Sequence, residues 1–135
     1  KLFREGIEYS GVGRYEAART KLLAADKIDP RNPDVLAQIG VTYYARGDLA
    51  NAERFYRRAL QADPDSTLAH YNLACVLVQQ GRHKEALREL RAAVDSGFNA
   101  VSEIDADPDL KPLHDDPAFK EIRALAEKNV ARAGR

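Results

Sequence analysis

The sequence predicts an all-α protein, a solenoid of three helical hairpins closed by a C-terminal helical segment. Glycine recurs every 34 residues, at Gly13, Gly47 and Gly81. Between these glycines, apolar residues recur at the spacing of one helix face. Further positions repeat with the same step, namely Ala18/Ala52/Ala86, Ala25/Ala59/Ala93 and Pro30/Pro64. A fixed period of this size predicts stacked helical units that share one continuous core.

The first unit is assigned to residues 1–32. Gly13 separates its two helices, because glycine adopts the left-handed conformation that often ends a helix. Leu22 and Ala25 give the second helix an apolar face, and Pro30 ends the unit.

The second unit, residues 33–66, shows the pattern best. Asn32 is a good N-cap, and Pro33 suits a first helical turn, where its missing N–H costs nothing. The turn is assigned to Gly47. The apolar face comprises Leu36, Ile39, Gly40 and Tyr43 in the first helix, and Leu49, Ala52, Tyr56, Ala59 and Leu60 in the second. Its small residues allow neighbouring helices to approach closely, while its two tyrosines fill the space between hairpins.

The third unit, residues 67–98, begins after Ser66, which can cap its first helix, and Gly97 breaks its second helix. Residues 99–135 leave the pattern and are predicted to form a capping segment. This segment contains a short helix, an Asp/Pro-rich loop and a terminal amphipathic helix. The apolar positions of the terminal helix are Phe119, Ile122, Ala126 and Val130. Such a helix can cover the exposed flank of the last hairpin.

These residues are those of the tetratricopeptide repeat, and residues 1–98 resemble that family closely. The second unit matches the family pattern throughout, at Gly40, Tyr43, Gly47, Ala52, Tyr56, Ala59 and Pro64. The first unit departs from it at Glu5, and the third at Ala74, Leu77 and His83 and by lacking a final proline. The resemblance implies a right-handed solenoid. The Asp-Pro segment is also similar to tails that close some bacterial arrays, which favours a bacterial source.

The first helix of each unit lines the concave side of such a solenoid. The face that the core leaves free predicts a largely apolar groove that binds a partner. Its residues are Phe3, Ile7, Gln38, Val41, Tyr44, Leu68, Tyr71, Asn72, Cys75, Val78 and Gln79. Contiguous apolar surface usually marks an interaction site. The alternative is that the superhelix, the C-terminal helix or further repeats bury these positions.

One known use of the family is not expected. Repeat domains that hold acidic chaperone tails grip the terminal carboxylate with Lys, Asn and Arg on these faces. Of the matching positions Phe3, Ile7, Val41, Leu68 and Asn72, only Asn72 is polar.

Other groups of reactive or charged residues favour structural interpretations. Arg46, Arg54, Arg57 and Arg58 are expected on a solvated outer face, where Glu53 can pair with Arg57, although a phosphate-binding patch stays open. Cys75 lies in mid-helix and is expected to be a small packing residue rather than a nucleophile.

Residues 105–117 alternate acids as a calcium loop does. However, Leu110 stands where the loop needs glycine, and Pro108 and Pro112 remove backbone donors. No metal is expected. Instead, Asp107 and Asp116, each before a proline, are expected to start helical turns, with Leu110 and Leu113 plugging the last hairpin.

Composition sets the remaining limits. Lys plus Arg and Asp plus Glu each number 21, which argues against a nucleic-acid surface or a polybasic membrane patch. No apolar run is long enough to span a bilayer, and a cytoplasmic protein is expected, with the periplasm left open. The sequence has no Met, even at position 1, so it is expected to begin inside a longer protein.

The sequence therefore predicts a non-catalytic scaffold that holds a partner peptide or helix in its groove and needs no cofactor. Two alternatives remain. One is a structural or self-assembly module that packs against further repeats or a second copy, and the other is a regulatory domain of a larger protein.

Overall fold

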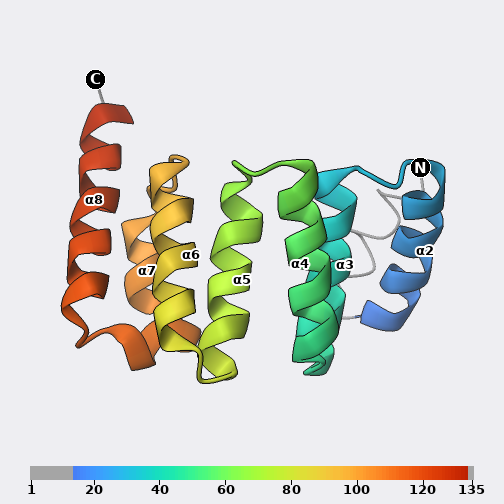
Figure 1. Ribbon diagram of the computed structural model, residues 1–135, viewed down its shortest axis with the longest axis horizontal. Coiled ribbons are helices and arrows are strands. Elements are labelled where there is room, and N and C mark those ends of the chain that lie inside the picture. Colours follow the sequence, from blue (N-terminus) through green and yellow to red (C-terminus); the bar gives the residue numbers. More distant parts are fainter. Residues whose placement is uncertain (1–13, 134–135) are drawn as a thin grey trace.

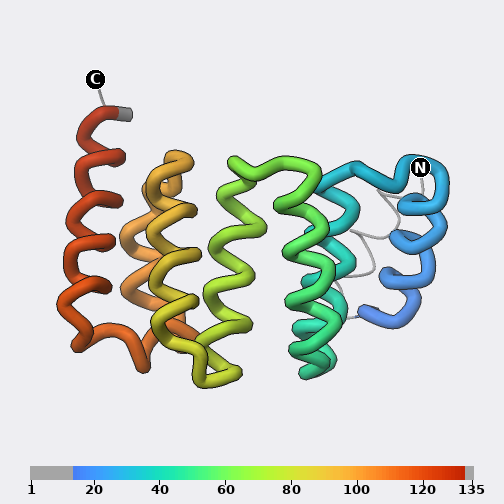
Figure 2. The backbone as a smooth tube through the Cα atoms, viewed as in Figure 1, coloured from blue at the N-terminus to red at the C-terminus, as the bar shows by residue number. Residues whose placement is uncertain are grey.

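The computed structural model describes residues 14–133, and over this range the chain is a row of helices. The elements are α2 (Tyr15–Ile28), α3 (Pro33–Arg46), α4 (Leu49–Ala62), α5 (Thr67–Gln79), α6 (His83–Asp95), α7 (Val101–Ala106), the 3₁₀ helix η1 (Pro108–Leu113) and α8 (Pro117–Ala133). They follow one another along the molecule, with α2 and α8 at opposite ends (Figures 1 and 2). Among the described helices, none combines the length and apolarity needed to cross a membrane.

The helix ends confirm the predicted caps. The side chain of Asn32 accepts hydrogen bonds from the backbone N–H groups of Asp34 at 3.0 Å and Val35 at 3.2 Å. Ser66 accepts one from Ala69 N at 3.2 Å. Gly47 has φ 85°, a left-handed conformation that glycine adopts without strain. The chain therefore turns where the repeat pattern indicates.

Close approach of α3 and α4 depends on Gly40. A Cβ atom at this position would lie 2.6 Å from Cε1 of Tyr56, whose ring is buried between the helices. The small residue and the large ring therefore act as a pair that sets the distance between the two helices. This confirms the close approach predicted at Gly40, and Tyr56, which was predicted to fill the space between hairpins, also belongs to the core shared with α5 and α6.

The C-terminal segment closes the array. Leu110 and Leu113 of η1 are buried, as are Phe119, Ile122 and Ala126 of α8, and all five belong to one core with α5 and α6. Val130 differs from the prediction, because 48% of its surface is exposed. The end of α8 projects beyond α6, so the last turn has no neighbour to cover it (Figure 1).

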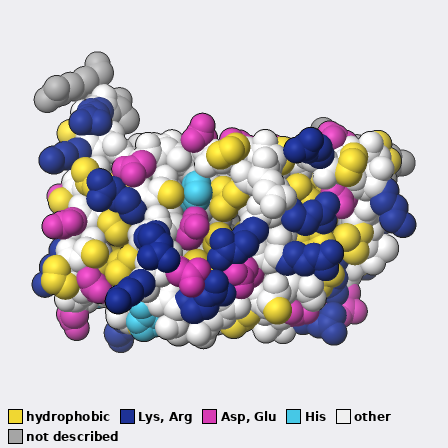
Figure 3. Space-filling model, in the orientation of Figure 1, with side chains coloured by type: hydrophobic (Ala, Val, Ile, Leu, Met, Phe, Trp, Pro, Cys, Tyr) yellow, Lys and Arg dark blue, Asp and Glu magenta, His cyan; other side chains and the backbone are white. Residues whose placement is uncertain are grey.

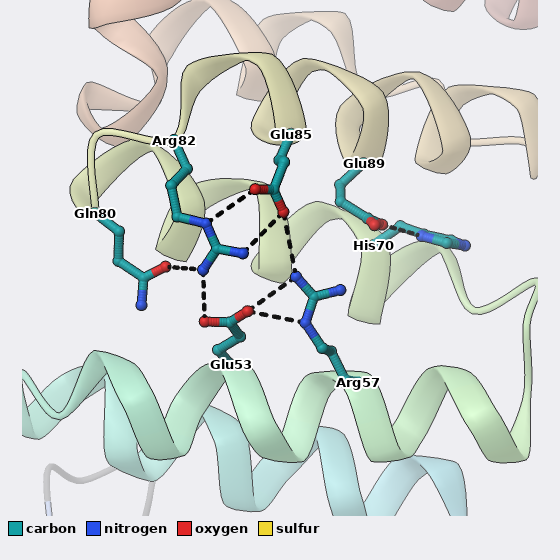
Figure 4. A network of polar contacts seen from close by, with 7 residues as sticks. All are labelled: Glu53, Arg57, His70, Gln80, Arg82, Glu85 and Glu89. Atoms are coloured by element: carbon teal, nitrogen blue, oxygen red, sulfur yellow. Dashed lines mark hydrogen bonds and ion pairs between the residues drawn. The ribbon is translucent and has the colours of Figure 1, made fainter.

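A network of ion pairs joins α4 to α6 (Figure 4). Arg82 Nη1 lies 2.9 Å from Glu53, and its Nη2 lies 2.8 Å from Glu85. Arg57 contacts the same two acids, at 2.9 and 3.6 Å. Nearby, His70 of α5 contacts Glu89 of α6 at 2.7 Å. The network thus links the second and third units outside their apolar core.

Candidate partner-binding groove

The structure places the described groove residues on α3 and α5 but divides them into two parts. Phe3 and Ile7 lie outside the described residues. The open part consists of Gln38, Val41, Leu68 and Asn72: Leu68 exposes 45% of its surface and the other three are half-buried. The second part, which we call the covered part because most of it lies under the C-terminal segment, consists of Tyr44, Tyr71, Cys75, Val78 and Gln79. Tyr71, Cys75 and Val78 are buried, Tyr44 is half-buried and Gln79 is exposed.

The covered part is held by a short stretch that we call the strap, residues 107–113. Tyr71 donates its hydroxyl hydrogen to Oδ2 of Asp107 at 2.6 Å, and the thiol of Cys75 lies 3.8 Å from the same oxygen. Tyr44 donates to Oδ2 of Asp109, and Gln79 Nε2 donates to Oδ1 of Asp109 at 3.1 Å. Two groove tyrosines and one amide therefore bind two carboxylates of the same chain.

Local hydrogen bonds within the strap fix its backbone conformation. Oδ1 of Asp107 accepts the backbone N–H of Asp109 at 2.9 Å, the N-cap contact of η1. Pro108 suits the first position of this helix, where no N–H is required. The cap leaves Oδ2 of Asp107 free to face α5. Phe98 completes the cover by stacking on the Tyr71 ring, with 4.8 Å between ring centroids.

The electrostatics of the covered part favour neutral side chains. Burial, together with the hydrogen bond to Asp109, raises the pKa of the Tyr44 hydroxyl. Burial and the bond to Asp107 raise the pKa of Tyr71 in the same way. Burial, followed by the charge of Asp107, also raises the pKa of the Cys75 thiol. A nucleophilic cysteine needs the opposite shift, so this environment suits the predicted packing role.

Cys75, Asp107 and Asp109 also come together as a metal site would bring them, with one ligand atom from each within 4.8 Å of the others. Both oxygens of each carboxylate already accept a hydrogen bond from Tyr44, Tyr71, Gln79 or the backbone of Asp109. Hydrogen bonding therefore accounts for the arrangement of these acids without a metal ion.

The predicted arginine cluster is paired with acids and aromatic rings. Arg57 pairs with Glu53 as expected from their spacing, Arg58 lies 3.4 Å from Asp26, and Arg46 lies 3.4 Å from Glu16. Arg54 lies over the ring of Phe55, 5.8 Å from its centroid. Basic and acidic side chains are interspersed over the face in Figure 3. These contacts support the interpretation as an ordinary outer face.

Sequence reasoning missed that the strap binds to Tyr44, Tyr71, Cys75 and Gln79, which together we call its seat. Asp107 was expected to start a helical turn, and Asp109 was considered only as part of a calcium-loop pattern that was rejected. A signal was present, because the predicted groove contained two tyrosine hydroxyls and several amides, all donors, while residues 105–117 contained five carboxylates that can accept hydrogen bonds. Matching donors to acceptors would have brought the two segments together.

Known proteins resemble this chain in sequence and in fold. Two models of the tetratricopeptide repeat match residues 43–106 and residues 3–67. A TPR repeat-containing protein of Pseudomonas aeruginosa, PA4667, is 45% identical over 56 residues, 42% of this chain and 10% of that protein. The chain spans a tenth or less of the length of the first curated relatives it matches.

Solved structures give the same fold. The first TPR of Spaghetti, bound to the HSP90 peptide SRMEEVD, has a TM-score of 0.69 at 19% identity, covering 94% of this chain and 91% of that one. The Yersinia enterocolitica chaperone SycD, in complex with a peptide of the translocator YopD, has a TM-score of 0.69 at 20% identity, covering 98% and 92%. At these identities the likeness concerns the fold alone.

Proposed function

Because the chain belongs to the tetratricopeptide repeat family, we propose that it is a non-catalytic scaffold that binds a peptide or helix of a partner protein along its groove. The open part of the groove carries this proposal. There, Leu68 is exposed beside half-buried Asn72 on α5, and half-buried Gln38 and Val41 lie on α3, which packs against α5. Apolar side chains flanked by two amides can bury a partner's side chains and orient its backbone.

Two further observations support a protein partner. SycD is solved with a translocator peptide and Spaghetti with an HSP90 peptide, so this fold holds protein segments in other chains. In this chain, the arginines that a nucleic acid would need are largely engaged with acids such as Glu53 and Asp26. We also propose the cytoplasm as its compartment, where the buried free thiol of Cys75 would stay reduced.

The proposal is tested by photo-crosslinking in cells that produce the full-length protein. A photoreactive residue replaces Gln38, and crosslinked partners are identified by mass spectrometry. We expect Val41→Glu to reduce the crosslinked product at least ten-fold, because a carboxylate there would be desolvated by an apolar partner. The matched control is Val130→Glu, the same change at an exposed position of α8, which should leave the yield unchanged. Equal yields from both variants, with unchanged circular dichroism, would refute the groove assignment.

A further inference from the structure

The strap occupies the covered part of the groove in the way a bound peptide would. Its two carboxylates meet donors from two different helices, Tyr44 on α3 and Tyr71 and Gln79 on α5. Its Leu110 then enters the apolar core behind them and is fully buried. Hydrogen bonds from groove side chains, followed by one buried aliphatic residue, are the contacts by which a peptide docks into such a groove.

The charges of this seat are unbalanced. Carboxylate oxygens of Asp107 and Asp109 lie within 4.8 Å of each other, and both groups are half-buried. The donors that reach these oxygens from the described residues are two hydroxyls, one amide, one thiol and one backbone N–H, all uncharged. Two like charges at this distance repel each other, and no described cation offsets the repulsion by an ion pair. The strap is therefore held by neutral hydrogen bonds and by the buried side chains of Leu110 and Leu113, while its two carboxylates repel each other.

We propose that the strap is an internal ligand that gates the covered part of the groove. The inference rests on the proposed function and specifies its partner: the segment that replaces the strap presents two carboxylates two residues apart, followed by an aliphatic residue. Such a segment reproduces each contact that Asp107, Asp109 and Leu110 make with the groove. Exchange then replaces the hydrogen bonds and the buried side chain of Leu110 by an equivalent set, and a second aliphatic residue three positions later replaces the buried Leu113.

Gating has a measurable consequence. When a binding-competent state is only partly populated, the apparent dissociation constant is the intrinsic one divided by the competent fraction. Weakening the strap while leaving the groove intact should therefore tighten binding of a competing peptide. Weakening the groove hydroxyls should remove that gain.

The experiment uses the full chain and a fluorescein-labelled synthetic peptide with the sequence of residues 105–113 as the probe. Fluorescence anisotropy compares the natural chain with Asp107→Ala/Asp109→Ala, and we expect at least ten-fold tighter binding by the variant. A charge-matched control, Asp115→Ala/Glu121→Ala, removes two exposed acids outside the seat and should bind as the natural chain does. Adding Tyr44→Phe/Tyr71→Phe to the strap variant keeps both rings and should abolish the gain. Circular dichroism and thermal melting establish that each variant is folded.

Four results would overturn the inference. The strap variant and the natural chain could bind the probe equally, the charge-matched control could show the same gain, or the gain could survive loss of both hydroxyls. If a folded strap variant shows no binding at all, the seat does not accept a peptide. Crosslinking through Gln38 and Val41 in the open part does not depend on these outcomes, so the proposed function can stand when the gate fails.

Discussion

Gly40 illustrates how a single residue sets a helix-to-helix distance. The space that a side chain of residue 40 would occupy is filled by the ring of Tyr56. A Cβ atom at residue 40 would clash with this ring, at 2.6 Å from its Cε1. Thirty-four residues later the corresponding pair is Ala74 and Leu90, both fully buried. The third unit therefore fills the same space with a methyl group and a smaller aliphatic side chain. The two pairs are alternative solutions to one packing problem.

We expect Gly40→Ala to lower the free energy of unfolding by about 0–2 kcal/mol. The methyl group gains helix propensity of about 1 kcal/mol but overpacks the buried Tyr56 ring, which costs about 1–3 kcal/mol. Urea denaturation measures the difference. In a Tyr56→Leu background the same change should be neutral or stabilising, as the Ala74/Leu90 pair suggests. An equal loss in both backgrounds would show that the ring is not the cause.

Residues also differ in how well the sequence predicts them. Asn32, Gly47 and Ser66 act on backbone groups within a few positions, so local chemistry was enough to assign them. Asp109 meets Tyr44 from 65 positions away, and no periodic pattern connects the two. Its position depends on where α7 and η1 place the strap, which is a tertiary property.

Between elements, the ion-pair network complements the apolar contact. Burial alone would raise the pKa of Glu53, but hydrogen bonds from Arg57 and Arg82 outweigh it, and the pKa lies below its usual value. A hydrogen bond from Arg82 also lowers the pKa of Glu85. Carboxylates with depressed pKa values stabilise the fold in their ionised form. The link between α4 and α6 is therefore present at neutral pH and depends on acidity.

We expect Glu53→Gln to destabilise the chain by about 1 kcal/mol at pH 7, because the network is partly exposed and multidentate. For a lowered pKa, the stabilisation is complete above the unfolded value, near 4.5, and is lost as pH falls through the folded value. The difference between the natural chain and the variant should therefore shrink below about pH 4.5. Denaturation at a series of pH values measures it, with Glu121→Gln on the exposed face of α8 as control. A difference that persists at pH 3 would contradict the electrostatic explanation.

The C-terminal segment was predicted in kind and in its general place, because α8 covers the last hairpin and Leu110 and Leu113 enter its core as expected. The spacing of Phe119, Ile122 and Ala126 identified the buried face of α8, and Asp107 with Pro108 marked a break. Periodicity could not indicate that α8 extends beyond α6 and leaves Val130 exposed, because that depends on the relative lengths of the packed helices. Nor could it indicate that Asp107 and Asp109 would meet the hydroxyls of Tyr71 and Tyr44.

For the molecule as a whole, the repeat period determines most of the architecture. A core of residues from α2, α3, α4 and the start of α5 meets a second core that runs from α4 to α8, and Tyr43 and Leu60 pack against both. Each unit is therefore stabilised by packing against the next, as in other solenoids. The hairpin of α5 and α6 is followed by α7, η1 and α8, and buried residues of η1 and α8 cover its apolar flank.

Because α8 covers the last hairpin, its removal provides a test that distinguishes a monomeric scaffold from a self-assembling module. We expect a chain ended at Asp116 to self-associate, because loss of α8 uncovers the buried positions that Phe119, Ile122 and Ala126 protect. The natural chain should not associate through that end. Sedimentation velocity over a concentration series measures both, and circular dichroism verifies that the shortened chain keeps its other helices.

Val130→Glu is the control for this experiment, since that side chain is already exposed and its change should leave sedimentation unaltered. A natural chain that associates as concentration rises would contradict the prediction. If Val41→Glu then restored the monomer, the groove itself would be the self-assembly surface, and a second copy would replace the partner peptide as its ligand. If Val41→Glu had no effect, association would involve a surface outside the open groove, and the proposed peptide site would stand beside it.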